Sequence, residues 1–148
     1  MIRPTAVAGL VAALTLQLPL AAAADPQDAI DYRQHIMNAL NEQAAALGEI
    51  LSGAVPDDNA IAHLDALSLT AATALKAFEP KAPGGQSKPE VWSQWADFSK
   101  RMNDFAQKTA DMAKAAHAQG KEAGLAQVMD ALSCKKCHDT YRQEKKTP

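Results

Sequence analysis

Four helical segments separated by turn signals are the feature of this 148-residue sequence that most limits how it can fold. The segments run over residues 26–52, 57–78 and 89–119, followed by a fourth that reaches nearly to the C-terminus. Gly53, Pro80 and Gly120 stand at the junctions, and both residue types commonly end a helix. No stretch alternates apolar and polar residues as a half-buried strand would. The sequence therefore predicts an all-α domain.

The segments carry apolar stripes with helical spacing. In the first segment the stripe comprises Ile30, Met37, Leu40, Ala44, Leu47 and Leu51. In the third it comprises Val91, Trp95, Phe98, Met102, Phe105, Thr109 and Met112. Steps of three and four residues place these side chains on one face, which is buried against neighbouring helices. Such faces, joined by short connections, predict an antiparallel up-down-up-down four-helix bundle, which can hold a cofactor between facing helices.

The first 24 residues have the composition of a secretory signal peptide. Arg3 gives a basic start, residues 6–20 form an apolar core, and four alanines precede Asp25. The apolar core is too short to span a bilayer, and no later segment is long and apolar enough to do so. We therefore expect an exported single domain over residues 25–148, located in a bacterial periplasm. Loss of Arg3 from the 15 basic residues leaves 14 against 17 acidic ones, which does not indicate binding to nucleic acid or to a membrane surface.

A Cys-Lys-Lys-Cys-His run from Cys134 to His138 holds the only two cysteines of the chain. C-x-x-C-H is the attachment motif of c-type haem, in which each thiol adds to one vinyl group of the porphyrin. His138 lies four residues after Cys134 on the same helix face, where it can ligate the iron. The run therefore predicts one covalently bound haem c per chain, held by Cys134 and Cys137.

Three other interpretations of the motif explain less. A structural zinc site needs four protein ligands, and no second pair of similar spacing follows. A thioredoxin-like redox pair would lie near a βαβ pattern, which is absent from the sequence. A disulfide between Cys134 and Cys137 would close too short a loop to stabilise much, and it leaves His138 unexplained.

The fourth segment does not keep one face. Its apolar stripe comprises Leu125, Val128, Met129 and Leu132. At about 100° per residue, Cys134, His138 and Tyr141 project nearly opposite that stripe. Both faces cannot point into one core on a straight helix. Either a kink or bulge intervenes near residues 130–133, which we expect, or one of the faces is buried against something else. Met129 is then expected in the core, as are Met102 and Met112.

Three short patterns together resemble one known family. They are C-K-x-C-H-D-x-Y-R from Cys134 to Arg142, P-x-D-A-x-x-Y-R-Q from Pro26 to Gln34, and Pro-Glu-Val-Trp from Pro89 to Trp92. Together they resemble the class II cytochromes c, the cytochrome c′ family, over essentially the whole exported chain. The resemblance implies an up-down-up-down bundle with haem bound covalently near one end. Homodimerisation through the first two helices is common in that family, and the sequence does not decide it.

The resemblance gives Met37 a particular role. Most cytochromes c′ have a non-ligating apolar residue at this position, which leaves the iron five-coordinate and selective for small gases. In low-spin members a methionine there supplies the sixth ligand, and its thioether raises the reduction potential. The resemblance thus implies Met37 and His138 as an axial pair. The alternative is that Met37 only lines the distal pocket, since methionine readily fills gaps in a core.

Other residues are expected around the haem. Arg33 falls within the first apolar stripe, where a charge needs a partner or a route to water. A haem propionate would pair with it; alternatively, its stem snorkels at the bundle end. By resemblance Arg142 flanks the proximal face, and Tyr141 and Trp92 either wall the haem or simply pack in the core.

These inferences lead to a predicted function: a periplasmic one-electron carrier, not an enzyme, with His/Met-ligated haem. Its partners would be periplasmic redox proteins, met through small and transient contacts. Basic residues near the motif form either a docking patch for them or a solvated helix end. The first alternative function is a five-coordinate cytochrome c′ that binds nitric oxide or carbon monoxide. The second is a non-haem metal or structural bundle.

Overall fold

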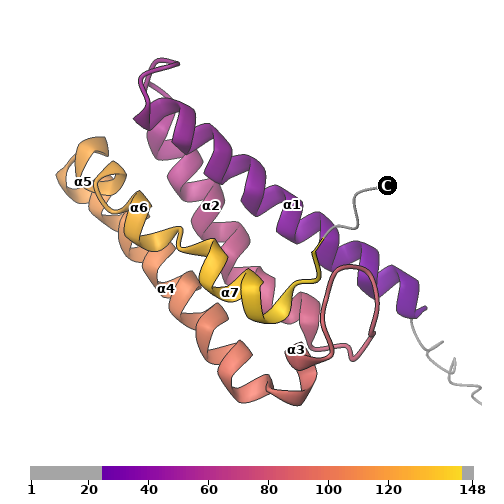
Figure 1. Ribbon diagram of the computed structural model, residues 1–148. Coiled ribbons are helices and arrows are strands. Elements are labelled where there is room, and N and C mark those ends of the chain that lie inside the picture. Colours follow the sequence, from indigo (N-terminus) through magenta and orange to yellow (C-terminus); the bar gives the residue numbers. More distant parts are fainter. Residues whose placement is uncertain (1–24, 145–148) are drawn as a thin grey trace, which may run out of the picture.

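The computed structural model describes residues 25–144, so the expected signal peptide over residues 1–24 lies outside the described residues. The described part is helical and forms an antiparallel bundle (Figure 1). Its helices are α1 (Pro26–Leu51), α2 (Ala60–Ala74), α3 (Glu90–Ser93), α4 (Trp95–Gln119), α5 (Lys121–Leu125), α6 (Val128–Ala131) and α7 (Cys134–Tyr141). A 3-10 turn, Leu75–Phe78, extends α2. The predicted all-α four-helix bundle is confirmed, with α1, α2 and α4 as its long helices and α5 to α7 as a broken fourth.

The predicted ends of α1 agree with the structure because they follow from local chemistry. The side chain of Asp25 accepts a hydrogen bond of 2.8 Å from the backbone N–H of Gln27, and Pro26 occupies the first turn, where its missing N–H costs nothing. After Leu51 the chain reverses at Gly53, whose φ of 72° lies in the left-handed region.

The core lies where α1, α2 and α4 meet. The fully buried apolar side chains include Leu47, Leu64, Leu67 and Met112. Each contributes roughly 1.5–3 kcal/mol of hydrophobic stabilisation relative to an exposed position. None of the helices described within residues 25–144 is long and apolar enough to cross a membrane.

The third helix is not continuous, contrary to the single helix expected over residues 89–119. It breaks at Gln94, with φ −115° and ψ 39°, so that α3 precedes α4 as a separate turn. The indole N–H of Trp92 donates a 2.9 Å hydrogen bond to the carbonyl of Phe78, which holds α3 against the 3-10 turn. Because α3 is held there, α4 can change direction and bury Phe98 in the core.

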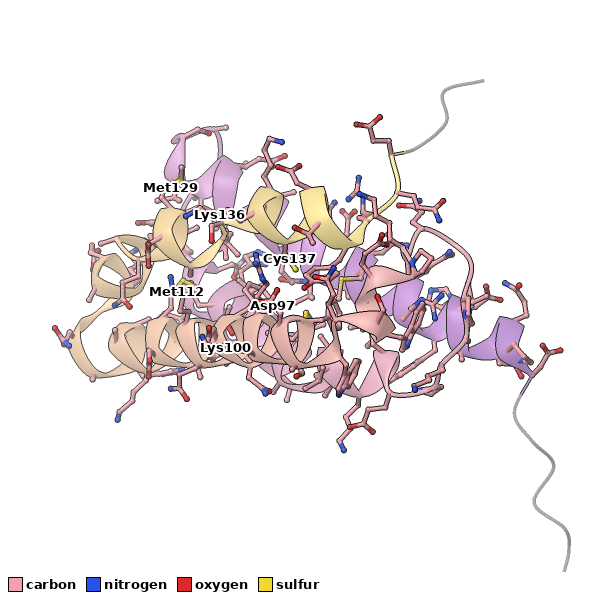
Figure 2. All side chains as sticks on the ribbon, turned by 60° about the horizontal axis from the view of Figure 1, so that its bottom comes forward. Asp97, Lys100, Met112, Met129, Lys136 and Cys137 are labelled. Atoms are coloured by element: carbon pink, nitrogen blue, oxygen red, sulfur yellow. The ribbon has the colours of Figure 1, made fainter. Side chains whose placement is uncertain are left out.

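The expected break in the fourth helix is confirmed, and there are two. One lies between α5 and α6, and the other at Leu132 and Ser133, whose ψ angles of 39° and 51° are not helical. After the first break α6 starts in a new direction, and Val128 and Ala131 are its buried residues. Met129 therefore faces solvent with 81% of its surface exposed, so its predicted core position is wrong (Figure 2). The second break turns α7 toward α3 and the space beside α1.

Candidate haem-binding site

Two adjoining cavities lie between α1, α4 and α7. The Arg33 cavity, of about 410 Å³, takes in Arg33, Gln34 and Gln86. The Cys134 cavity, of about 400 Å³, takes in Cys134, Phe105 and Leu132. Six residues line both cavities: Met37, Asn41, Met102, Cys137, His138 and Arg142. Each volume is typical of a pocket for a small molecule or cofactor, and together they form one space that runs past His138.

The Cys-Lys-Lys-Cys-His motif forms the first five residues of α7, directly after the second break. Cys134 is exposed, Cys137 is half-buried, and both are free thiols. Burial raises the pKa of the Cys137 thiol. Burial, and then the neighbouring charge of Arg142, lowers the pKa of His138, which favours the neutral imidazole that a metal requires. The break thus brings two thiols and an imidazole from one short helix to the same space.

Arg33 is buried, with only 2% of its surface exposed, which excludes the alternative that its stem snorkels into water. Its Nη2 donates a 2.8 Å hydrogen bond to the carbonyl of Gly84, and its guanidinium lies 5.2 Å from the ring centre of Trp92. Its Nη1 is buried and has no hydrogen-bond partner among residues 25–144, and burial lowers the pKa of the guanidinium. Since a buried charge needs a partner, this free N–H at the cavity wall fits an anionic group of a bound molecule.

Met37 lies on α1, one turn after Arg33, and is half-buried. It lines the same two cavities as His138, so the structure brings together the two residues predicted to flank the iron. Asn41 follows one turn later and lines both cavities as well. The sequence analysis missed Asn41, although its spacing of four from Met37, and of eight from Arg33, would have shown it.

The remaining predicted residues differ in their placement. Tyr141 is buried at the wall of the Arg33 cavity, and its hydroxyl donates a 2.5 Å hydrogen bond to Asp97. Arg142 lines both cavities, with Nη1 3.4 Å from Nδ1 of His138. Trp92 lines neither cavity and lies behind Arg33, because its indole N–H is bound to Phe78.

A bundle that presents Cys-x-x-Cys-His to a cofactor-sized space between its helices defines a class, the haem-binding four-helix bundles. The model of the family described as Cytochrome C' matches residues 28–142. This chain belongs to the cytochrome c′ family.

Relatives and solved structures agree with that assignment. The chain is 32% identical over 125 residues to cytochrome c′ of Alcaligenes xylosoxydans xylosoxydans, covering 82% of this chain and 98% of the relative. It is 32% identical over 130 residues to that of Pararhodospirillum photometricum, covering 81% and 100%. A similar solved structure is a nitric oxide complex of a variant of the Alcaligenes xylosoxidans protein, with a TM-score of 0.74, 31% identity, and 82% and 99% coverage.

Members of the family bind one covalent haem c per chain, and this chain binds haem c likewise. The residues present fit the group: two thiols and an imidazole on α7, two adjoining cavities, and a buried N–H on Arg33 that has no partner in the described part of the chain. The fit also removes the reason to consider zinc, a thioredoxin-like pair or a structural disulfide, since haem attachment uses both cysteines and the histidine.

The predicted function, a His/Met-ligated electron carrier, is wrong. The relatives are cytochromes c′, and the similar structures include nitric oxide complexes, which favours the five-coordinate alternative. Nothing in the comparisons supports a low-spin, six-coordinate branch. The prediction rested on the methionine that stands at one position within the resemblance, and a methionine that lines a cavity fills space as readily as it binds a metal.

Proposed function

We propose that this protein is a five-coordinate cytochrome c′ that binds nitric oxide or carbon monoxide. The observation that carries the proposal is the space formed by the two adjoining cavities, which both Met37 and His138 line. The chain is also similar to a cytochrome c prime that was solved as a nitric oxide complex. When bound, haem c would supply an iron that can take a small diatomic gas.

The residues of the chain then have separate roles. Cys134 and Cys137 would attach the haem through thioether bonds, and His138 would ligate its iron. Met37 lines the distal side, where its apolar bulk limits access by water and larger ligands. The free N–H of Arg33 pairs with a haem propionate as a charge-assisted hydrogen bond.

The same proposal covers location, partners and chemistry. The protein is exported to the periplasm by the segment over residues 1–24 and sequesters gas without converting a substrate. Periplasmic redox proteins, met transiently, keep its iron reduced. A homodimer uses α1 and α2, on which Tyr32 and Leu69 are large apolar side chains exposed to solvent.

The absorption spectrum of the holoprotein tests this function. We expect a high-spin spectrum in both oxidation states and stoichiometric binding of carbon monoxide to the reduced form. Met37→Leu and the matched Met102→Leu each remove a thioether from the cavity wall with little change in volume. Neither should change the spin state.

A low-spin wild-type spectrum with a methionine-to-iron charge-transfer band, lost in Met37→Leu and kept in Met102→Leu, would contradict the proposal. Met37→Ala adds a positive test. Because it removes bulk from the cavity wall, it should speed the association of carbon monoxide.

A further inference from the structure

One carboxylate on α4 connects that helix to both sides of His138. Oδ2 of Asp97 accepts a 2.5 Å hydrogen bond from the hydroxyl of Tyr141, and a 2.6 Å bond from Nε of Arg101. Arg101 in turn directs Nη1 toward the carbonyl of Lys136, at 3.4 Å. Lys136 lies between the two haem cysteines, and Tyr141 lies three residues after His138. The group of Asp97, Arg101 and Tyr141, here called the Asp97 network, therefore holds α7 on both sides of the predicted iron ligand.

Within the described residues, the other charged or polar side-chain pairs of α4 do not reach α7. Lys100 bonds to Asp104, and the amide of Gln107 to Asp111, within the exposed surface of the helix. Such local pairs contribute little to stability. Asp97 has the same spacing of four from Arg101, but it also accepts from a phenol whose residue is only 3% exposed. Figure 2 shows Asp97 and Cys137 on the facing sides of α4 and α7, whereas Lys100 is labelled on α4 away from that space.

The protonation states of Tyr141 and Asp97 favour one fixed direction of the hydrogen bond between them. Burial, together with the bond to Asp97, raises the pKa of Tyr141 to about 12. The bonds from Tyr141 and Arg101 hold the pKa of Asp97 below its ordinary value. The phenol thus stays a donor and the carboxylate an acceptor at every physiological pH. The ring of Tyr141 also packs 5.1 Å from that of Phe98, centre to centre, which fixes the direction of its hydroxyl.

The fold makes α7 dependent on such contacts. The break at Leu132 and Ser133 means that no continuous helix holds α7 in line with α6. Its C-terminal end is tied to the loop before α3, through the backbone N–H of Lys88 to the carbonyl of Tyr141, at 2.9 Å. On the α4 side, the Asp97 network supplies the polar contacts to this helix within residues 25–144.

We propose that the Asp97 network positions His138 and so sets the strength of its bond to iron and the affinity for gas. The inference rests on the proposed five-coordinate function. Asp97, Arg101 and Tyr141 are positioning residues, because they act through the backbone of α7 and not by contact with the iron. Loss of an interaction that orients a metal ligand typically changes affinity or activity 10- to 100-fold. We expect a change of about tenfold here, since the contact is indirect.

The test uses the reduced holoprotein and measures its iron–histidine stretching band by resonance Raman spectroscopy, with the dissociation constant for carbon monoxide. Tyr141→Phe removes one hydroxyl and keeps the ring, and Asp97→Asn removes the charge of an exposed carboxylate with little change in size. Asp111→Asn makes the same charge change elsewhere on α4 and lines neither cavity, so it is the matched control. Far-UV circular dichroism and haem content verify that each variant is folded and loaded.

We expect the band to shift or split in Tyr141→Phe and in Asp97→Asn, with a change of about tenfold in the dissociation constant, and to stay unchanged in Asp111→Asn. Asp97→Asn weakens the bonds from both Tyr141 and Arg101, whereas Tyr141→Phe removes the Tyr141 bond alone, so the double variant should differ little from Asp97→Asn. A band that is unchanged in both single variants overturns the inference and leaves the proposed function intact. A wild-type protein with no such band, because its iron is six-coordinate and low-spin, overturns both.

Discussion

Gly124 and Gly48 allow the packing of the broken fourth helix to be tested with one kind of substitution. Both glycines lie inside helices, in α5 and α1. A Cβ at Gly48 would meet nothing within 4 Å. A Cβ at Gly124 would lie 2.7 Å from Cβ of Ala116, 2.7 Å from Cδ1 of Leu64 and 2.9 Å from the backbone oxygen of Met112. The missing side chain at Gly124 therefore lets α5 lie directly against α2 and α4.

The magnitudes follow from two opposing effects. Replacing glycine by alanine inside a helix stabilises the folded state by about 0.5–1 kcal/mol, and this gain applies to both positions. At Gly124 the new methyl group must also displace its neighbours, which costs typically 1–3 kcal/mol. Leu64 can rotate, but Ala116 and the backbone of Met112 can yield only if α4 moves. We therefore expect Gly48→Ala to stabilise the protein and Gly124→Ala to be less stable than Gly48→Ala by about 1–3 kcal/mol.

Equilibrium unfolding of the two holoproteins in urea, followed by far-UV circular dichroism, measures both changes. The difference between the two variants cancels the shared helix-propensity gain and isolates the cost of the close contact. If Gly124→Ala were as stable as Gly48→Ala, α5 would not pack against α2 and α4 at this distance. The position of the chain between α4 and α7 would then have to be explained by other contacts.

Two further predictions concern the site. Arg33→Met should lower the unfolding free energy of the holoprotein by about 3 kcal/mol, because the haem propionate proposed to pair with Arg33 would lose its partner; an unchanged urea midpoint would show that the propionate does not depend on Arg33. Asp97→Asn should change the pH dependence of stability. Since the Tyr141 and Arg101 bonds lower the folded-state pKa of Asp97, their stabilisation is present above the unfolded pKa of about 3.9 and is lost as the pH falls through the lower folded value. The stability gap between wild type and Asp97→Asn should therefore be constant near neutral pH and shrink below about pH 4, whereas a gap that persists in acid would contradict the ionic role of this carboxylate.

The helices of the bundle could be predicted because their signals are local. Spacing of apolar residues fixes which face is buried, and Gly53 and Pro80 mark where helices end. The break before α7 could also be predicted, since the stripe through Val128 and Leu132 does not share a face with His138. Met129 was misplaced because periodicity was extended through the first break, at Ala126 and Gln127, after which the helix starts in a new direction.

The contacts around the site could not be predicted, because they join residues far apart in the chain. Nothing near Arg33 in sequence indicates that its partner is the carbonyl of Gly84, 51 residues away. The bond between Tyr141 and Asp97 spans 44 residues. A charge at helical spacing from its neighbour predicts a local pair, so Asp97 and Arg101 read as ordinary surface residues until α7 is placed beside them.

Each helix break near the haem-binding site is accompanied by a contact that helps to position a residue of that site. The break at Gln94 separates α3 from α4, and it accompanies a Trp92 that lies under the Arg33 guanidinium. The break at Ser133 frees α7 from α6, so that His138 depends on Asp97 from α4 and on the loop through Lys88. Departures from regular local structure commonly concentrate at functional sites. The mismatch of faces in the fourth segment was therefore not a defect of the pattern. It marked where regular packing gives way to the placement of His138, a consequence that the variants of Asp97 and Tyr141 measure directly.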